Sequence, residues 1–180
     1  MKVTETKLPG VYVIEPQVFG DARGWFMETY SKLKTPQIDR EFVQDNHSMS
    51  AHKGTLRGIH FQHPPMQQAK LIRCVRGAIM DYAVDLRKDS ATFRQWISIE
   101  LSEDNKKQLF IPRGFGHAFV TLTDNTEVIY KADSYYSPEH DGAVLWSDPD
   151  LCIAWAVDQP TMSDKDRNAP TLRDLGLCEV

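Results

Sequence analysis

The chain alternates between short apolar runs and polar turns along most of its length. In residues 96–101 (Trp-Ile-Ser-Ile-Glu-Leu) large and polar side chains alternate with a period of two, so one face of this strand should pack on a core. Similar runs predict further strands at residues 11–14, 70–75, 78–86, 107–111, 117–122 and 126–132. Asp104 with Asn105, and Asp124 with Asn125, lie between such runs and predict turns. The pattern is typical of an antiparallel β barrel or sandwich.

Helical periodicity is scarce by comparison. Short helices are predicted only at residues 31–35 and, after an N-cap at Ser163, at residues 164–168. A chain of 180 residues without repeats, low-complexity segments or a linker fits one core, so we expect a single domain over residues 1–180. The tail from Pro160 onward is expected to form a flap that closes over the mouth of the barrel.

Charge and cysteine content narrow the function classes. A net charge of −4 offers no basic field for a nucleic-acid backbone, so we expect a small-molecule ligand and no nucleic-acid partner. Cys74, Cys152 and Cys178 are odd in number and show no paired Cys-x-x-Cys spacing, which favours reduced thiols over disulfides or a zinc site. The charged first residues and the lack of a long apolar run predict a soluble, cytoplasmic protein without a membrane partner.

Two distant segments carry the candidate chemistry, residues 58–62 (Gly-Ile-His-Phe-Gln) and 111–117 (Ile-Pro-Arg-Gly-Phe-Gly-His). The second has the Pro-x-Gly-x-x-His spacing with which cupin barrels end one strand and turn the histidine of the next strand inward. A metal-binding cupin would show His-x-His followed by Glu, whereas the first segment supplies only His60 before Gln62. We therefore expect no metal, and two histidines, His60 and His117, that move protons near neutral pH.

The position of His60 in its strand is predicted by alternation. With a period of two, Leu56, Gly58 and His60 share one face, and Arg57 and Ile59 share the other. This pattern predicts that His60 points into the barrel. A core histidine that is hydrogen-bonded to the backbone would show the same pattern.

Three further side chains have both a chemical and a structural interpretation. Lys70 precedes an apolar run, where it can present a positive charge to a developing oxyanion or simply be a solvated residue at a strand end. Tyr130 lies in an apolar strand and is either a general acid or a core residue. His117 points inward if Phe119 does, for catalysis or for structure.

Candidate binding residues lie in turns and polar runs. Arg23 and Arg57 stand beside glycines, where backbone can approach a phosphate and a guanidinium can bind it with two donors, although a surface arginine in a turn is equally consistent. Tyr135 and Tyr136 precede a Ser-Pro turn and can stack on a flat base. Residues 44–48 are a polar run that either lines a polyol site or forms a loop.

Taken together, these residues resemble the dTDP-4-dehydrorhamnose 3,5-epimerase family along nearly the whole chain. The segments that carry the resemblance are residues 19–24, 42–48, 56–62, 110–122, 130–131 with 135–138, and 163–166. It implies a mostly β, antiparallel jelly-roll (cupin-like) barrel with an N-terminal extension and a short helical C-terminal segment, which forms a homodimer and needs no cofactor. The implied reaction inverts carbons 3 and 5 of dTDP-4-dehydro-6-deoxy-D-glucose to give dTDP-4-dehydro-L-rhamnose, in dTDP-L-rhamnose biosynthesis.

The resemblance also implies residue roles. His60 would remove protons alpha to the 4-keto group, with its imidazole held by Asp166, while Tyr130 would return a proton from the opposite face and Lys70 would stabilise the enolate oxygen. Tyr136 would stack on the thymine ring. The remaining positions that match sugar-binding and diphosphate-binding residues are Arg23, Glu28, Gln44, Asn46, Arg57, His117 and Lys165.

The sequence departs from the family at one contact, and it leaves other functions open. Where the family has a glutamate after the Ser-Pro turn, this chain has Glu139-His140-Asp141, so either Asp141 or Glu139 takes that place. The family also suggests that N-terminal strands are exchanged between subunits, which would make Arg23 or Glu28 act on the neighbouring site. The alternatives are an epimerase that inverts a single carbon of another nucleotide-linked 4-keto sugar, a non-catalytic sugar-nucleotide-binding barrel, and a metal-dependent cupin.

Overall fold

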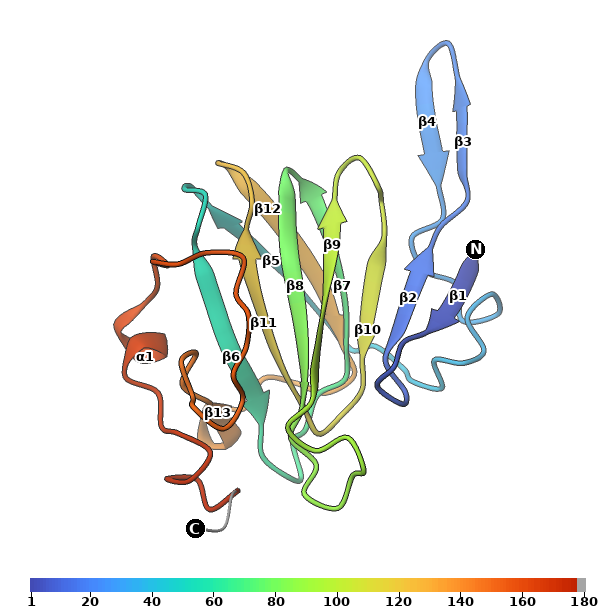
Figure 1. Ribbon diagram of the computed structural model, residues 1–180. Coiled ribbons are helices and arrows are strands. Elements are labelled where there is room, and N and C mark those ends of the chain that lie inside the picture. Colours follow the sequence, from blue (N-terminus) through green and yellow to red (C-terminus); the bar gives the residue numbers. More distant parts are fainter. Residues whose placement is uncertain (178–180) are drawn as a thin grey trace.

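The computed structural model describes residues 1–177, and strands dominate it (Figure 1). The strands are β1 (Lys2–Glu5), β2 (Tyr12–Glu15), β3 (Val18–Asp21), β4 (Gly24–Met27), β5 (Gln44–Ser50), β6 (Leu56–Gln62), β7 (Lys70–Arg76), β8 (Ala78–Asp85), β9 (Trp96–Ser102), β10 (Gln108–Ile111), β11 (Phe115–Thr121), β12 (Thr126–Ala132) and β13 (Asp141–Ala143). A 3₁₀ helix, η1 (Pro138–His140), and an α-helix, α1 (Asp164–Arg167), complete the described elements. The short C-terminal helix confirms the helix predicted after Ser163.

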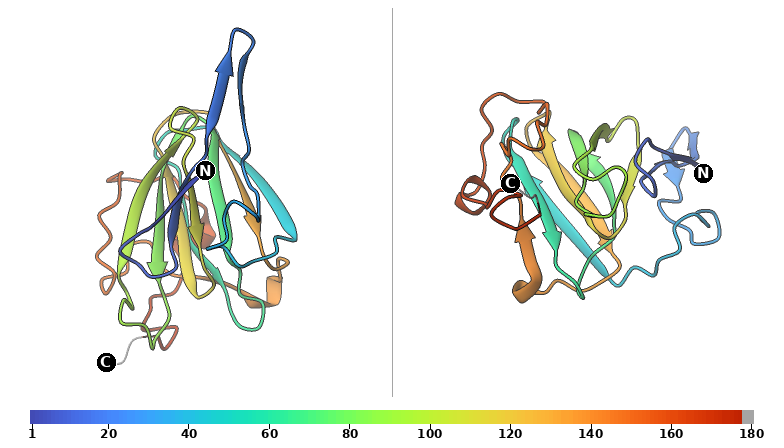
Figure 2. Two further views of the ribbon diagram at one scale, coloured as in Figure 1. Left: turned by 90° about the vertical axis from the view of Figure 1, so that its right-hand side faces the viewer. Right: turned by 60° about the horizontal axis from the view of Figure 1, so that its bottom comes forward.

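Two antiparallel sheets face each other and form the barrel (Figures 1 and 2). One sheet has the order β1-β2-β10-β7-β12-β5, and the other has the order β13-β6-β11-β8-β9. Apolar side chains from both sheets meet between them, among them Ile72 and Val128 from the first and Ala83 and Phe119 from the second. Alternation puts every second side chain of a regular strand into this interior. The predicted antiparallel barrel is confirmed.

The observed strands match the predicted ones wherever apolar residues dominate. Residues 70–75, 78–86 and 126–132 fall within one residue of β7, β8 and β12. The helix predicted at residues 31–35 is wrong: the segment forms a single turn, in which the N–H of Thr35 donates to the carbonyl of Ser31. The polar run at residues 44–48, which the sequence left open as a loop or a polyol site, is part of strand β5.

The alternation predicted for β6 is wrong in its first half. Leu56 and Ile59 both belong to the cluster on the outer side of the five-stranded sheet, although they are three residues apart. The ladder between β6 and β11 shifts register at this point, and Gly58 has a φ of +120°. A bulge of this kind adds one residue to the strand and so moves the following side chains to the other face.

Only glycine fits at position 58. A Cβ atom there would lie 2.5 Å from the carbonyl oxygen of His117 and 2.6 Å from the Cβ of Ala118. The bulge also points the N–H of Gly58 toward the side chain of Asp166. The local irregularity in β6 therefore helps to build the site described below.

The C-terminal tail, defined from here on as residues 144–177, covers the outer side of the five-stranded sheet. Its apolar residues, including Trp146, Trp155 and Leu172, pack with Tyr82 of β8 in the outer cluster. The hydroxyl of Tyr82 accepts from the N–H of Ala156 at 2.8 Å. This packing holds the tail beside β6, with α1 in contact with that strand. Within the described residues, 1–177, no helix is long and apolar enough to span a membrane.

The hairpin of β3 and β4 stands away from the barrel (Figures 1 and 2). It exposes large apolar side chains, with Phe19 53%, Trp25 58% and Phe26 67% accessible. Its clearest attachment is the ammonium group of Lys106, which lies 4.0 Å from the centre of the Trp25 ring. Three large apolar side chains that are each more than half exposed on one hairpin are typical of a surface that another chain covers.

Candidate active site

His60 and Asp166 form the first pair of the site. The Nε2 atom of His60, on β6, lies 2.7 Å from Oδ1 of Asp166, on α1. The other carboxylate oxygen accepts from the N–H of Gly58 at 3.3 Å, and the side chain of Ser163 caps the helix by accepting from the N–H of Asp166. Because a carboxylate only accepts, it holds the ring proton on Nε2 and leaves Nδ1 free to take a proton.

Asp166 is ionised in spite of its position. Asp166 is only 3% exposed, and burial by itself raises the pKa of a carboxyl group. The hydrogen bond and charge of His60, with the N–H of Gly58 and the hydroxyl of Ser163, outweigh this burial and hold the pKa of Asp166 below its ordinary value. A fixed negative charge therefore stabilises the imidazolium that forms when His60 takes a proton.

Lys70 and Tyr130 lie on the opposite wall of the barrel, on β7 and β12 of the six-stranded sheet. The ammonium group of Lys70 is 5.6 Å from the centre of the Tyr130 ring. The ring of His117, which pairs with His60 across β11 and β6, is 6.4 Å from that of Tyr130. The structure therefore brings together the four residues His60, Lys70, His117 and Tyr130 that the sequence had singled out.

The environment sets the protonation of the groups on this wall. Burial raises the pKa of the Tyr130 hydroxyl, so this residue keeps its proton at neutral pH, as a general acid must. Burial also lowers the pKa of Lys70 to about 8, against the opposing attraction of Asp81 and Asp141. Lys70 remains mostly charged at neutral pH and presents a cation inside the barrel.

Asp81 is a site residue that the sequence reasoning missed. It is fully buried on β8, and its Oδ1 lies 2.6 Å from Nε2 of His117. Its Oδ2 has no hydrogen-bond partner among residues 1–177. Burial raises the pKa of Asp81 and lowers that of His117, so the site holds a second histidine–aspartate pair under strong desolvation. A period of two along β8 puts Asp81 on the same face as the core residues Ile79 and Ala83, and a carboxylate on that apolar face was a signal that could have identified it.

A cavity of about 370 Å³ opens beside His60 and the tail. It is lined by Arg57, Lys165 and Asp166, among others. Arg57 is held in place by Ser50 and by the carbonyl of Met49, at 3.2 and 3.1 Å. Two cationic side chains at the mouth of a cavity suit a ligand that carries phosphate.

Tyr136, the residue expected to stack on the nucleobase, lies in the same region. The hydroxyl of Tyr136 donates to Asp141 at 3.2 Å, and Lys165 donates to the same carboxylate oxygen. The structure thus places Asp141, and not Glu139, between the tail and Tyr136. Gln44 accepts from the N–H of Tyr136 at 2.9 Å. Its amide nitrogen donates to Asn46 at 3.1 Å, so these two predicted residues lie side by side on β5.

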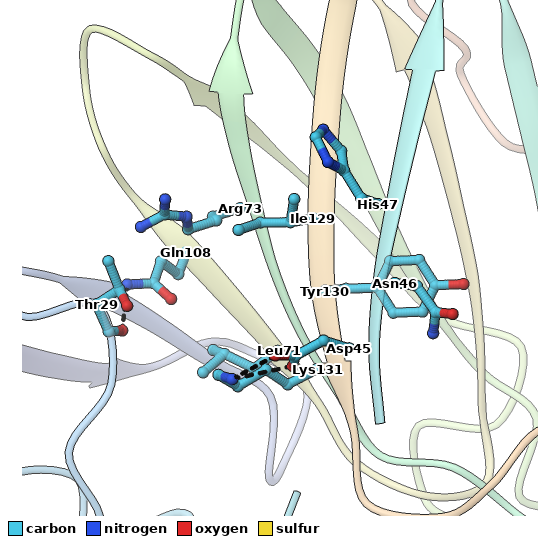
Figure 3. Close-up of a pocket in the computed structure, with 10 residues that line it drawn as sticks. All are labelled: Thr29, Asp45, Asn46, His47, Leu71, Arg73, Gln108, Ile129, Tyr130 and Lys131. Atoms are coloured by element: carbon cyan, nitrogen blue, oxygen red, sulfur yellow. Dashed lines mark hydrogen bonds and ion pairs between the residues drawn. The ribbon is translucent and has the colours of Figure 1, made fainter. Parts of the chain in front are cut away.

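A second pocket, of about 390 Å³, lies against β5, β7 and β12 on the face turned away from the interior of the barrel (Figure 3). Figure 3 shows Ile129 and Lys131 pointing to one side of β12 and the ring of Tyr130 to the other. Lys131 pairs with Asp45 at 2.9 Å on this outer surface. The guanidinium of Arg73 also lines the pocket, and its Nε and Nη1 atoms are buried without partners among the described residues.

Arg23 and Glu28 are not brought to the site within one chain. Arg23 is at the tip of the β3–β4 hairpin and pairs with Asp21, while Glu28 follows β4 and pairs with Lys34. Of the predicted thiols, Cys74 and Cys152 are free, and Cys178 lies outside the described residues. Within residues 1–177, no group of three or more His, Cys, Asp or Glu side chains is arranged to hold a metal ion.

Comparison with known proteins gives consistent results. The family model described as dTDP-4-dehydrorhamnose 3,5-epimerase matches residues 5–174. The epimerase of that name from Salmonella typhimurium is 49% identical over 183 residues, which is 99% of this chain and 100% of the relative.

Solved structures agree in fold as well as in sequence. The dTDP-4-dehydrorhamnose 3,5-epimerase of Bacillus anthracis, solved with TDP and PPi bound, is 53% identical with a TM-score of 0.92, and the match covers 95% of this chain and 99% of that one. An epimerase of Legionella pneumophila in complex with dTDP-4-keto-L-rhamnose is 38% identical with a TM-score of 0.91, over 98% and 96% of the two chains. The expected cupin-like fold is thereby confirmed.

Proposed function

The chain belongs to the dTDP-4-dehydrorhamnose 3,5-epimerase family, and we propose that its barrel site works by proton transfer between His60 and Tyr130. It is an isomerase with dTDP-4-dehydrorhamnose 3,5-epimerase activity in dTDP-rhamnose biosynthesis, and it binds dTDP-linked ligands. The observation that carries the residue roles is the placement of a paired histidine and a half-buried tyrosine on opposite walls of one barrel.

The first step is the removal of a proton. Hydrogens on carbons 3 and 5 are acidic because both carbons are next to the 4-keto group, and Nδ1 of His60 takes one of them. The electron pair of the broken C–H bond moves into an enolate, whose negative oxygen the charged Lys70 stabilises. Preorganised charge of this kind contributes roughly 3 to 4 kcal/mol per donor. Asp166 does not touch the sugar in this scheme, because it holds the tautomer and orientation of His60.

The second step is reprotonation from the other side. Inversion requires that the new hydrogen arrive on the face opposite the one that lost its proton. His60 projects from the five-stranded sheet and Tyr130 from the six-stranded sheet, so a sugar ring between the walls meets the base on one face and the acid on the other. Tyr130 gives its phenolic proton to the carbanion carbon, and solvent then restores both groups. The same two steps at the second carbon complete the reaction.

The roles predict separable defects in deuterated water. A Tyr130→Phe protein keeps the base, so proton NMR should show solvent deuterium entering carbons 3 and 5 while inversion falls by about 10² or more. A His60→Gln protein should lose both exchange and inversion. If Tyr130→Phe inverted the sugar at the wild-type rate, the tyrosine would not be the acid. Exchange at only one carbon in the wild-type protein would instead indicate a single-carbon epimerase.

We further propose that the protein is a homodimer in which each β3–β4 hairpin reaches the neighbouring site. The exposed Phe19, Trp25 and Phe26 supply an apolar surface for contact with the partner. Arg23 and Glu28 flank β4, and Figure 1 shows the β3–β4 hairpin apart from β6, the strand that carries His60. Arg73 in the outer pocket supplies donors that a second chain can satisfy, since its buried Nε and Nη1 atoms have no partner within residues 1–177. Free thiols at Cys74 and Cys152 support a cytoplasmic location, where reducing conditions preserve them.

Complementation tests this assembly directly. A Tyr130→Phe chain and an Arg23→Ala chain should each be inactive alone. After mixing by partial unfolding and refolding, a heterodimer would contain one intact site if Arg23 acts on its neighbour, and activity should return. If Arg23 acts within its own chain, both sites of the heterodimer stay defective and no activity returns. Light scattering of each protein gives the assembly state.

A further inference from the structure

The backbone around Tyr136 is held by two glutamine side chains. The amide oxygen of Gln62 accepts from the N–H of Ser137 at 2.7 Å, and its amide nitrogen donates to the carbonyl of Tyr135 at 3.1 Å. The oxygen of Gln44 accepts from the N–H of Tyr136 itself. Both peptide units that flank Tyr136 are therefore fixed, while the residue remains 54% exposed.

Gln62 is built for this task by its position and its chemistry. It ends β6, two residues beyond His60, and is only 6% exposed. Its second amide hydrogen goes to the carbonyl of Met66, so one buried planar group serves as both donor and acceptor. A glutamate would supply acceptors alone and a methionine neither, although both have nearly the same shape.

We propose that Gln62 is a positioning residue that sets the direction of the Tyr136 ring and thereby the affinity for the nucleobase. This inference rests on the proposed function, in which Tyr136 stacks on the thymine ring. A stacking ring contributes only when its plane is fixed before the ligand arrives, because ordering a loose side chain on binding costs free energy. Gln62 supplies that order through the backbone on either side of the ring.

The inference predicts a defect in nucleotide binding rather than in proton transfer. Among the described residues, the hydrogen bonds of Gln62 go to the backbone of Met66, Tyr135 and Ser137 and to none of the catalytic side chains. Loss of these bonds should loosen the ring and leave the pair of His60 and Asp166 in place. The Michaelis constant should rise while kcat stays within about threefold of its wild-type value.

Gln68, between β6 and β7, provides a matched control that bonds to the same loop as Gln62. Its amide nitrogen donates to the carbonyl of Ser134 at 2.8 Å, so it also fixes loop backbone through a side-chain amide. That carbonyl lies just before the peptide units that flank Tyr136. A Gln68→Met protein should therefore bind dTDP as the wild-type protein does.

The test is calorimetric titration of dTDP into six proteins: wild type, Gln62→Met, Gln62→Glu, Gln68→Met, Tyr136→Ala and the Gln62→Met/Tyr136→Ala double variant. Gln62→Met loses three hydrogen bonds, two of which fix the peptide units beside Tyr136. We expect it to weaken dTDP binding by roughly tenfold, which corresponds to the net contribution of those two bonds. In the Tyr136→Ala background the same change should cost less than about twofold, since no ring is left to position. Gln62→Glu keeps the acceptor for Ser137 and should show an intermediate loss, with circular dichroism reporting the fold of each variant.

The possible results separate this inference from the function on which it rests. Wild-type affinity of Gln62→Met, or of Gln62→Glu if the methionine variant does not fold, would overturn the positioning role alone. An equal loss in the presence and absence of the Tyr136 ring would overturn it as well, because Gln62 would then act on the fold in general. Wild-type affinity of Tyr136→Ala would instead remove the stacking role, and the inference with it.

Discussion

Replacement of Asp166 with asparagine should disable the base without changing the shape of the site. Asparagine has nearly the same volume, and the N-cap bond from its own N–H to Ser163 involves only the backbone of residue 166. The substituted side chain cannot satisfy both of its neighbours, however. Its oxygen can face either Nε2 of His60 or the N–H of Gly58, and its NH₂ group then faces the other.

The size of the defect follows from these contacts. A hydrogen bond to a charged group contributes roughly 1.5 to 3 kcal/mol, or about 10- to 150-fold in rate when it acts on the imidazolium. When the NH₂ group faces His60, the ring proton moves to Nδ1 and the base is blocked. In serine proteases the corresponding change of the triad aspartate lowers kcat by about 10⁴. We therefore expect kcat/KM of the Asp166→Asn protein to fall by about 10² to 10⁴.

The assay follows inversion and deuterium exchange by proton NMR, with dTDP affinity measured alongside. Asp164→Asn is the matched control, because Asp164 lies on the same short helix but is exposed, and among residues 1–177 only its backbone carbonyl is engaged, by Asn168. That control should stay within about twofold of wild type. A comparably small effect of Asp166→Asn, with dTDP binding unchanged, would refute the tautomer argument and leave Asp166 with a structural role only.

Two further substitutions test how burial and close packing shape the site. Lys70→Met should abolish most turnover yet stabilise the fold by up to about 3 kcal/mol near neutral pH, since burial lowers the pKa of Lys70 from 10.5 to about 8. The unfolded chain binds more protons between those values, so the gain in urea unfolding should be full below pH 8 and absent above 10.5; a gain independent of pH would contradict this account. Gly58→Ala should cost about 3 kcal/mol or more, because its Cβ would meet the carbonyl of His117. Gly24→Ala, at a φ of +135° with no atom within 4 Å, measures the backbone strain alone in the same denaturation assay, and equal losses would show that the close approach costs nothing.

The strands that could be predicted from the sequence are those whose burial repeats with a simple period. Strand β12 was predicted to the residue, and its burial extends from its first residue, Thr126, to its last, Ala132. Strand β5 was not predicted as a strand. It lies at the edge of its sheet, and polar side chains occupy both of its faces. An edge strand buries little area, so its sequence carries a weak signal.

Irregular backbone explains the failure at β6. Alternation assumes that each residue advances the strand equally, and the bulge at Gly58 breaks this assumption between Leu56 and Ile59. The requirement for glycine comes from the carbonyl of His117, which is 59 residues away in sequence, and no local pattern reports it. The inward direction of His60 was nevertheless correct, because the bulge precedes it.

The pairing of His60 with Asp166 could be expected from the family resemblance but not from residue patterns. The serine cap predicted a helix near residue 164, yet the helix faces β6 only because the tail, as far as residue 177, packs on the outer side of the five-stranded sheet. Local signals thus placed the carboxylate on a helix, and tertiary packing brought it to the histidine.

Arg23 and Glu28 depend on packing beyond one chain, since the hairpin strand between them buries little of its apolar surface on its own chain. Which catalytic pair Arg23 and Glu28 approach depends on the surface that covers the hairpin. The complementation experiment therefore decides which site they serve.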